Sequence, residues 1–270
     1  MKHSVLRKWY FMILKKRKSI KYILSKIKIN KPIIYFVTNY VTANDCANIC
    51  LAIGASPIMA DEKLEAGEIT QIADAIVINT GTLNQFTFDA MKIVCSVANQ
   101  RHIPIILDPC GVGCSSFRNE CIKTLITKYK FHAIRGNLSE IAFIQSMLSQ
   151  DCNAIKHQNR GGVDSHITMN EKQKSQMAIQ LAQQLSCVIC ISGKIDIITD
   201  GKNIQYCNAG NNILQSITGT GCMLTAVIAC FCSTKQDYLE LTFLACEFFG
   251  KNAKKFLYSK IKSIKKINKV

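Results

Sequence analysis

The stretch Ile103-Pro104-Ile105-Ile106-Leu107-Asp108-Pro109-Cys110-Gly111-Val112-Gly113 indicates how this chain folds. Its first half is a short apolar run rich in β-branched residues, which is typical of a strand buried in a parallel sheet. The run ends at a carboxylate, Asp108, and a glycine-rich loop follows. Ligands of open α/β sheets bind beyond the carboxyl ends of the strands, so this position predicts a functional site.

Similar runs recur along the chain and alternate with helical patterns. Strands are expected over Ile33–Asn39, Ala75–Thr80, Ile103–Asp108, Ala133–Asn137, Cys187–Gly193, Asp196–Asp200 and Ile204–Asn208. Helices are expected over Asn44–Ile53, Glu62–Ala73, Phe86–Gln100, Phe117–Lys130, Ser139–Leu148, Met169–Leu185, Gly221–Phe231 and Tyr238–Leu257. This alternation predicts a layered α/β fold in one domain, with a mostly parallel central sheet flanked by helices. The last two strands predict a hairpin.

Composition excludes several classes of protein. The chain has 270 residues, of which 48% are hydrophobic and 19% charged, so it is neither a disordered tail nor a small disulfide scaffold. The longest uncharged apolar stretch, Cys222 to Cys232, is far shorter than the ~20 residues of a membrane-spanning helix. We therefore expect no membrane association, and the lack of a secretory signal pattern predicts a cytoplasmic location.

The excess positive charge lies in two tails. The formal net charge is +16, but residues 1–31 hold 11 Lys and Arg without an acid, and residues 251–270 hold 8 Lys without an acid. The remaining body is slightly acidic, which argues against nucleic-acid recognition. We expect a basic, solvated N-terminal extension over 1–31, starting at Met1 or Met12. We expect the folded domain over residues 32–257 and a Lys-rich tail over 258–270.

The 14 cysteines are not spaced as zinc ligands or as a redox motif. Cys187 and Cys190 belong to an expected strand, where residues three apart point to opposite faces. We expect the cysteines to be buried, reduced thiols, with Cys222 as the exception.

The segment Thr218-Gly219-Thr220-Gly221-Cys222 precedes an apolar helix. Glycines at a loop-to-helix junction leave backbone N–H groups and the helix dipole to face an anion. A thiol in the first helical turn has a lowered pKa, so Cys222 is a candidate catalytic group. A glycine-rich turn beside a buried cysteine is the structural alternative. Neither the P-loop nor the dinucleotide-binding fingerprint is present.

A second candidate segment is Arg135-Gly136-Asn137-Leu138-Ser139-Glu140. Arg135 suits phosphate oxygens, and Asp108 together with Glu140 could hold Mg²⁺ directly or through water. The same segment is also typical of a helix cap, because Glu140 comes three residues after Asn137.

Taken together, eight ordered motifs resemble the hydroxyethylthiazole kinase family between about residues 32 and 250. They are residues 37–44 (VTNYVTAN), 47–48 (AN), 54–60 (GASPIMA), 79–82 (NTGT), 107–113 (LDPCGVG), 134–137 (IRGN), 162–165 (GVDS) and 219–222 (GTGC).

The resemblance implies a ribokinase-like fold and ATP-dependent phosphorylation of 4-methyl-5-(2-hydroxyethyl)thiazole, a salvage step toward thiamine. It implies Mg²⁺ as cofactor and a homotrimer with sites between subunits. With the acids singled out above, the candidate site residues fall into four groups. They are Cys222 as the active-site residue; Met59, Gly219 and Asn39 at the substrate; Arg135, Ser192, Thr220 and Gly221 at ATP; and Asp108 and Glu140 at the metal.

Two alternatives stay open. The first is another ribokinase-like kinase, such as one for hydroxymethylpyrimidine, although Cys222 stands where such enzymes carry Asp. The second is a binding protein without turnover. Family members often have a basic residue shortly before the GTGC turn, and Leu214-Gln215-Ser216 offers none here.

Overall fold

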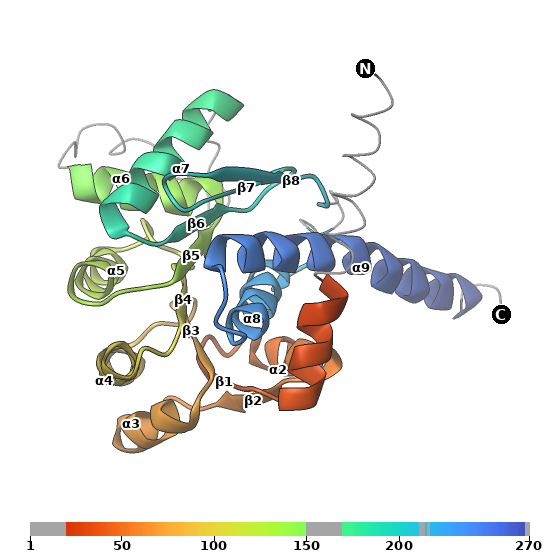
Figure 1. Cartoon of the computed structure of the whole chain (residues 1–270), viewed down its shortest axis with the longest axis horizontal. Helices are drawn as coiled ribbons and strands as arrows, with labels where there is room; N and C mark the ends of the chain where they lie inside the picture. The colour runs from red at the N-terminus through yellow and green to blue at the C-terminus, as the bar shows by residue number, and fades with distance from the viewer. Residues whose placement is uncertain (1–19, 150–168, 211–213, 215–216, 268–270) are drawn as a thin grey trace.

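The computed structural model describes residues 20–149, 169–210, 214 and 217–267, with side chains up to residue 252. Within these residues eight strands form one sheet in the order β2-β1-β3-β4-β5-β6-β7-β8 (Figure 1). The strands are β1 Ile33–Val37, β2 Ser56–Met59, β3 Ala75–Asn79, β4 Ile105–Asp108, β5 Ala133–Gly136, β6 Val188–Ile191, β7 Asp196–Thr199 and β8 Ile204–Cys207. From β2 through β6 all neighbours are parallel, so the carboxyl ends of these strands share one edge.

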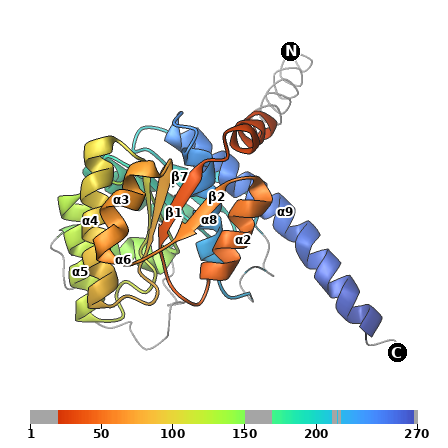
Figure 2. The ribbon, with the colours of Figure 1, turned by 90° about the horizontal axis from the view of Figure 1, so that it is seen from below.

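Helices cover both faces of the sheet and make three layers (Figure 2). The labelled helices are α2 Ala43–Ile53, α3 Lys63–Ile72, α4 Gln85–Arg101, α5 Ser116–Lys128, α6 Leu138–Ser149, α7 Glu171–Leu185, α8 Thr220–Cys232 and α9 Tyr238–Ile267. Helices α3 to α7 pack on one face, while α2, α8 and α9 pack on the other. In β1, Tyr35 and Ile34 are fully buried on opposite faces, which explains an apolar run without polar alternation.

The predicted α/β architecture is confirmed, and so is the hairpin of β7 and β8, whose strands pair antiparallel. The sequence did not predict β2, which pairs only with β1 at the edge of the sheet. This strand has four residues and contains Pro57, and proline is tolerated in sheets chiefly on edge strands. Pro57 makes this segment look unlike a strand in the sequence, and it is tolerated here because β2 is an edge strand.

Part of the predicted N-terminal extension belongs to the packed body. Residues 20–30 form a helix, in which Ile23 and Ile27 are 2% and 0% exposed and join the core beneath α2 and α8. The prediction of a solvated extension over 1–31 is therefore wrong for residues 20–30. The apolar face of this helix is buried in the core, while Lys21 and Lys28 are exposed to solvent. Residues 1–19 lie outside the described part of the chain.

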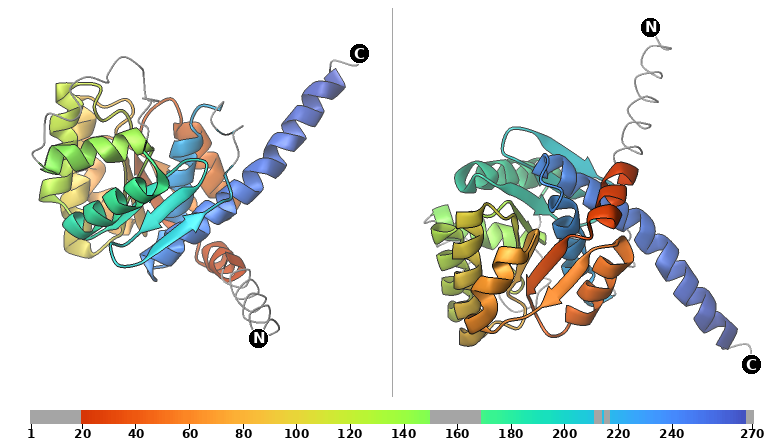
Figure 3. Two further views of the ribbon diagram at one scale, coloured as in Figure 1. Left: turned by 90° about the horizontal axis from the view of Figure 1, so that it is seen from above. Right: turned by 60° about the horizontal axis from the view of Figure 1, so that its bottom comes forward.

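The predicted boundary at residue 257 falls inside α9, which continues to Ile267. Figure 3 shows this helix projecting beyond the body of the molecule toward its carboxyl end. None of the described helices is long and apolar enough to cross a membrane.

We expect Ile27→Ala to lower the free energy of unfolding by about 2–4 kcal/mol, since it leaves a cavity in the core. Ile29→Ala is the matched control, because Ile29 is 79% exposed, and surface changes shift stability by about 0.5 kcal/mol at most. Urea unfolding followed by circular dichroism measures both variants. Equal midpoints for the two variants would contradict the packed position of this helix.

Candidate active site

Five predicted site residues lie at the shared carboxyl edge of the sheet. Asn39 follows β1, Asp108 ends β4, Arg135 lies in β5, and Ser192 follows β6. Glu140 lies in the first turn of α6, directly after β5. The amino end of α8 meets them from the other layer, because Thr225 Oγ1 donates to Asp108 Oδ2 at 2.9 Å. This edge therefore brings together two carboxylates, a guanidinium and a helix amino terminus.

Two glycines allow α8 to approach the strands closely. Gly219 caps the helix with φ of 85°, and a Cβ there would lie 2.6 Å from Cγ2 of Thr42. A Cβ on Gly221 would lie 2.8 Å from Nη2 of Arg135. Neither space accepts a side chain, so both glycines of the GTGC turn are required by contact, and Gly219 is required by its backbone conformation as well.

The Cys222 sulfur accepts hydrogen bonds from several donors. Nδ2 of Asn79 lies 3.3 Å away and Nδ2 of Asn39 lies 3.4 Å away. The Asn39 amide also donates to Oδ1 of Asn79 at 2.9 Å, so the two amides hold each other in place. The Cys110 thiol is a further donor to Cys222. These contacts orient the sulfur at the strand ends.

The pKa of Cys222 is lowered to about 7. The main cause is the hydrogen bond from Cys110, and Thr42 and Asn39 add to it, whereas burial and the charge of Asp108 act in the opposite direction. The pKa of Cys110 is raised, because its thiol is the donor in this pair and is partly buried. The thiolate of Cys222 is therefore accessible near neutral pH, which suits a general base.

Asp108 and Arg135 form a buried ion pair, with Nη1 of Arg135 lying 3.7 Å from Oδ2 of Asp108. Burial raises the pKa of Asp108, and Arg135 and Thr225 offset part of that rise. Burial by itself lowers the pKa of Arg135, but the charges of Asp108 and Glu140 outweigh it, so the pKa is raised. The guanidinium stays charged at the strand ends.

Arg135 is also held by Ser192, whose Oγ accepts from Nη2 at 2.5 Å and donates to the carbonyl of Gly136 at 3.2 Å. The buried Nε of Arg135 has no hydrogen-bond partner among the described residues. A buried donor without an acceptor is costly, and an anionic ligand oxygen would satisfy it.

Glu140 closes the predicted cap. Its Oε2 accepts from the backbone of Asn137 at 2.8 Å, while its own N–H donates to Oδ1 of Asn137 at 2.8 Å. Its Oε1 accepts from the N–H of Gly111 at 3.2 Å. Burial raises the pKa of Glu140 to about 7, and repulsion by Asp108 adds to the rise. The carboxylate of Glu140 therefore forms the cap while it lies close enough to Asp108 for the two charges to repel each other.

Met59 and Thr220 complete the predicted set. Met59 ends β2 and packs, half-buried, against the same core cluster as Cys222. The hydroxyl of Thr220 donates to the carbonyl of Leu214 at 2.9 Å, so it fixes the turn before α8. The motif at 162–165 lies outside the described residues, as do Gln215 and Ser216.

Sequence reasoning missed the roles of four residues. Asn79 and Cys110 contact Cys222, Thr225 binds Asp108, and Arg118 Nη2 donates to the carbonyl of Gly81 at 2.6 Å. Asn79 and Cys110 stand in motifs already recognised, so their place at strand ends was the available signal. Thr225 lies three residues after Cys222, on the same face of α8.

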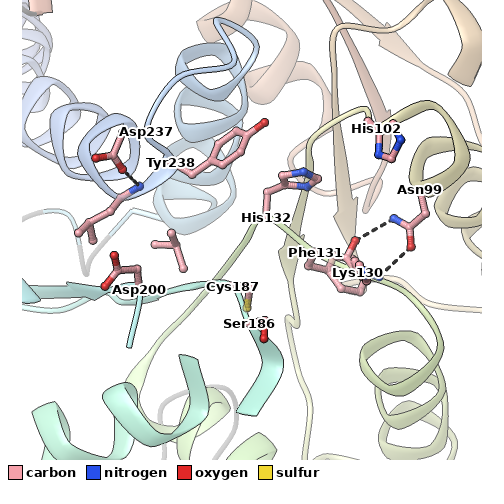
Figure 4. Close-up of a pocket in the computed structure, with 12 residues that line it drawn as sticks. Asn99, His102, Lys130, Phe131, His132, Ser186, Cys187, Asp200, Asp237 and Tyr238 are labelled. Atoms are coloured by element: carbon pink, nitrogen blue, oxygen red, sulfur yellow. Dashed lines mark hydrogen bonds between the residues drawn. The ribbon is translucent and has the colours of Figure 1, made fainter. Parts of the chain in front are cut away.

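A separate cavity of about 410 Å³ lies at the opposite edge of the sheet (Figure 4). It is lined around the amino ends of β5 and β6, where His132 stacks edge-on against Tyr238 at 4.8 Å between ring centres. Burial lowers the pKa of His132, and its Nδ1 accepts from the N–H of Ile105. None of the predicted site residues lines this cavity.

Comparison with known proteins assigns the chain to a family. The model of the hydroxyethylthiazole kinase family matches residues 24–264. This chain belongs to that family. A hydroxyethylthiazole kinase of Ruminiclostridium cellulolyticum is 43% identical over 224 residues, which cover 83% of this chain and 79% of that protein.

Solved structures of other proteins have a similar fold. A hydroxyethylthiazole kinase protein of Pyrococcus horikoshii superposes with a TM-score of 0.79 at 28% identity, over 91% of this chain and 87% of the other. A ribokinase-like superfamily protein of Enterococcus faecalis has a TM-score of 0.57 at 13% identity, over 86% and 81% of the two chains. The second similarity shows the fold alone, and it confirms the predicted ribokinase-like architecture.

We expect Gly221→Ala to displace the Arg135 guanidinium and to lower the rate of phosphoryl transfer about 10- to 100-fold, equivalent to about 1.4–2.8 kcal/mol. Steady-state assays against ATP concentration measure this loss. Gly67→Ala in α3 is the control, because its Cβ would meet nothing closer than 3.8 Å. Full activity in Gly221→Ala would contradict the tight contact between α8 and Arg135.

We expect the alkylation rate of Cys222 by iodoacetamide to rise with pH and to reach half its plateau near pH 7, because only the thiolate reacts. Peptide mass spectrometry gives the rate for this cysteine alone. A short model peptide with one cysteine, whose ordinary thiol pKa is about 8.5, serves as the reference. An inflection for Cys222 at or above that of the reference would contradict the lowered pKa.

Proposed function

We propose that this protein transfers the γ-phosphoryl group of ATP to the hydroxyl of 4-methyl-5-(2-hydroxyethyl)thiazole, the salvage reaction that leads toward thiamine. The observation that carries the proposal is the Cys222 sulfur at the amino end of α8, held by Asn39 and Asn79 beside the Asp108–Arg135 pair. Such a site offers a base and fixed positive charge at one point, which phosphoryl transfer requires.

The phosphate side of the proposed site consists of donors. Arg135 lies against the first turn of α8 and carries a buried Nε without a partner among the described residues. The backbone N–H groups of Gly219 through Cys222 begin the same helix, where partial positive charge gathers. These groups would stabilise the charge that develops on the transferred phosphoryl oxygens. Ser192 keeps the guanidinium oriented.

The acids fit Mg²⁺ held largely through water. Asp108 and Glu140 are both buried, and burial together with repulsion by Asp108 raises the pKa of Glu140, so a divalent cation nearby would relieve unfavourable charge. Both oxygens of Glu140 already accept backbone hydrogen bonds, which favours contact through a water molecule. Mg²⁺ usually keeps several waters and takes only one or two carboxylates besides phosphate oxygens. The ion would neutralise phosphate charge when bound.

The acceptor side centres on Cys222. Its thiolate would take the proton of the substrate hydroxyl as the hydroxyl oxygen attacks the γ-phosphorus of ATP. The new oxygen–phosphorus bond would form as the bond from the γ-phosphorus to the β,γ-bridging oxygen breaks, so the products would be a neutral thiol, the phosphorylated alcohol and ADP. Asn39 and Asn79 keep the sulfur pointed at that position throughout. The negative charge of Asp108 limits the thiolate population, so we propose that Cys222 is a modest base. Met59 and Gly219 would contact the thiazole ring.

We also propose that the protein works as a homotrimer with sites between subunits. Large apolar side chains are exposed in the loops and helix starts beyond the carboxyl edge of the sheet. They are Tyr40 (66% exposed), Val41 (68%), Leu64 (84%) and Phe86 (77%). A cluster of this kind beside a site is typical of a surface covered by another subunit.

We also propose a cytoplasmic location. The described cysteines are all free thiols, which is typical of a reducing compartment.

The direct test is product analysis by mass spectrometry after incubation with Mg-ATP and the thiazole alcohol, with hydroxymethylpyrimidine as a parallel acceptor. We expect phosphorylated thiazole and no phosphorylated pyrimidine. Pyrimidine phosphate alone would overturn the assigned specificity. Thiazole binding without any phosphorylated product would indicate a binding protein that has lost turnover.

We expect Cys222→Asp to keep or raise the activity, because a carboxylate accepts a proton in the same geometry, and Cys222→Ala to lower kcat about 10²- to 10⁴-fold. Steady-state rates for both variants provide the measurement. Cys114→Ser, an exposed cysteine outside the site, controls for the loss of a thiol. Loss of activity in Cys222→Asp together with retention in Cys222→Ala would refute the role of Cys222 as a base.

A further inference from the structure

One arginine outside the predicted site residues holds the loops that follow two central strands. Nη2 of Arg118 donates to the carbonyl of Gly81 at 2.6 Å. Nη1 of the same side chain donates to the carbonyls of Thr80 and Cys110, and it lies 3.2 Å from the Cys110 oxygen. Thr80 and Gly81 follow β3, whereas Cys110 follows β4. A single guanidinium therefore connects the carboxyl ends of these two neighbouring strands.

The place of Arg118 in its own helix does not explain these contacts. Arg118 lies in the first turn of α5, which Ser115 caps, and Oγ of Ser115 accepts from the N–H of Arg118 at 3.2 Å. Partial positive charge gathers at a helix amino end, so a basic residue there is locally unfavourable. No carboxylate among the described residues forms an ion pair with Arg118. The three carbonyls therefore hold the guanidinium in place.

We propose that Arg118 is a positioning residue for phosphoryl transfer, and that it acts through Asn79 on the sulfur of Cys222. The inference rests on the proposed function, because it assumes that Cys222 receives the substrate proton. The hydrogen bonds of Arg118 end on backbone oxygens. Its effect on the reaction therefore passes through the loop after β3 and needs no contact with substrate.

A rigid peptide group links Arg118 to Asn79. The carbonyl of Thr80 and the N–H of Gly81 belong to the same peptide group, which is planar. The carbonyl accepts from Arg118, and the N–H donates to Oδ1 of Asn79 at 2.9 Å. Fixing one end of this planar group therefore fixes the direction in which the other end points. Asn79 transmits that orientation to the site, because its Nδ2 donates to the Cys222 sulfur at 3.3 Å.

The second amide at the sulfur depends on Asn79 as well. Nδ2 of Asn39 donates to Oδ1 of Asn79 at 2.9 Å and to the Cys222 sulfur at 3.4 Å. If the Arg118 contacts are lost, both donors at the sulfur are released through one residue, Asn79. Misplacement of a catalytic group by about 1 Å can cost about 10²-fold in rate. Removal of Arg118 should therefore lower turnover without removing any group that contacts substrate.

The first test measures local structure in the full-length protein without catalysis. Amide hydrogen exchange followed by NMR reports the N–H of Gly81 in Arg118→Gln, which lacks the charge and the fork of donors. We expect this amide to exchange at least about tenfold faster, because its peptide group is no longer held at the carbonyl. The amide of Ile106, in the centre of β4, should keep its protection. Arg101→Gln is the matched control, because Arg101 is exposed and donates only to the Gln71 side chain.

Turnover is the second measurement. In Arg118→Gln, kcat for thiazole phosphorylation should fall about 10- to 100-fold, while the KM for ATP changes less than about twofold, because Arg118 contacts none of the proposed phosphate-binding groups. Continued protection of Ile106 shows that unfolded protein does not cause the fall. Arg118→Lys keeps the charge but has a single ammonium group instead of a fork, so its kcat should be intermediate.

A double-mutant cycle tests the route through Asn79. Asn79→Ala removes the amide that donates to Cys222, so Arg118→Gln should lower kcat by less than about twofold further in that background. In the natural background the same substitution should have its full effect. Effects of Arg118→Gln and Asn79→Ala that multiply as independent factors would overturn the route through Asn79.

These outcomes separate the inference from the proposed function. Unchanged exchange at Gly81 in Arg118→Gln would overturn the positioning role, and so would a kcat equal to that of Arg101→Gln. If exchange at Gly81 rises but the natural chain never phosphorylates the thiazole, the link from Arg118 to the loop is supported and the proposed function fails. If Arg118→Gln does not fold, the same measurements on Arg118→Lys decide between these outcomes.

Discussion

The close approach of α8 to the carboxyl edge of the sheet is the constraint on which the site depends. Five parallel strand pairings bring the loops after the strands to one edge, and the hydrogen bond between Thr225 and Asp108 ties α8 to the centre of that edge. The approach is feasible only because Gly219 and Gly221 leave room for Thr42 and Arg135. Cys222 then reaches Asn79, which lies on a strand more than a hundred residues earlier in the chain.

Charge at this edge is unbalanced in a way that suits a kinase. Two buried carboxylates, Asp108 and Glu140, face one buried guanidinium, and removing one partner from such a pair typically costs about 3–5 kcal/mol. Arg135 compensates part of the negative charge, yet the pKa values of both acids are still raised. A bound cation would complete the balance, and the proposed Mg²⁺ of a nucleotide would supply that charge. The arrangement that is costly in the free protein therefore favours the proposed ligands.

The strands other than β2, the polar residues at their ends and the cap of α6 could be predicted from the sequence, because each depends on residues that are close together in the chain. Apolar runs that end in Asp108, Asn137 or a Ser-Gly step predict buried strands with polar ends, and the cap of Glu140 follows from spacing alone. The order and register of the strands could not be predicted in this way, because they depend on residues far apart in the chain. Asn79 is opposite Asp108 in the β3–β4 pairing, and no local pattern states which strand ends are neighbours. The partnership of Asn79 and Cys110 with Cys222 is long-range, and so is the burial of the N-terminal helix through Ile27.

The choice of a thiol at the base position has a consequence that a carboxylate would not have. A proton acceptor must present lone-pair electrons to the substrate hydroxyl, and the donors around Cys222 prepare its sulfur for this task. The same electrons react with peroxide, whereas a carboxylate is not oxidised under these conditions. Basicity and oxidation sensitivity of the site therefore have one physical origin.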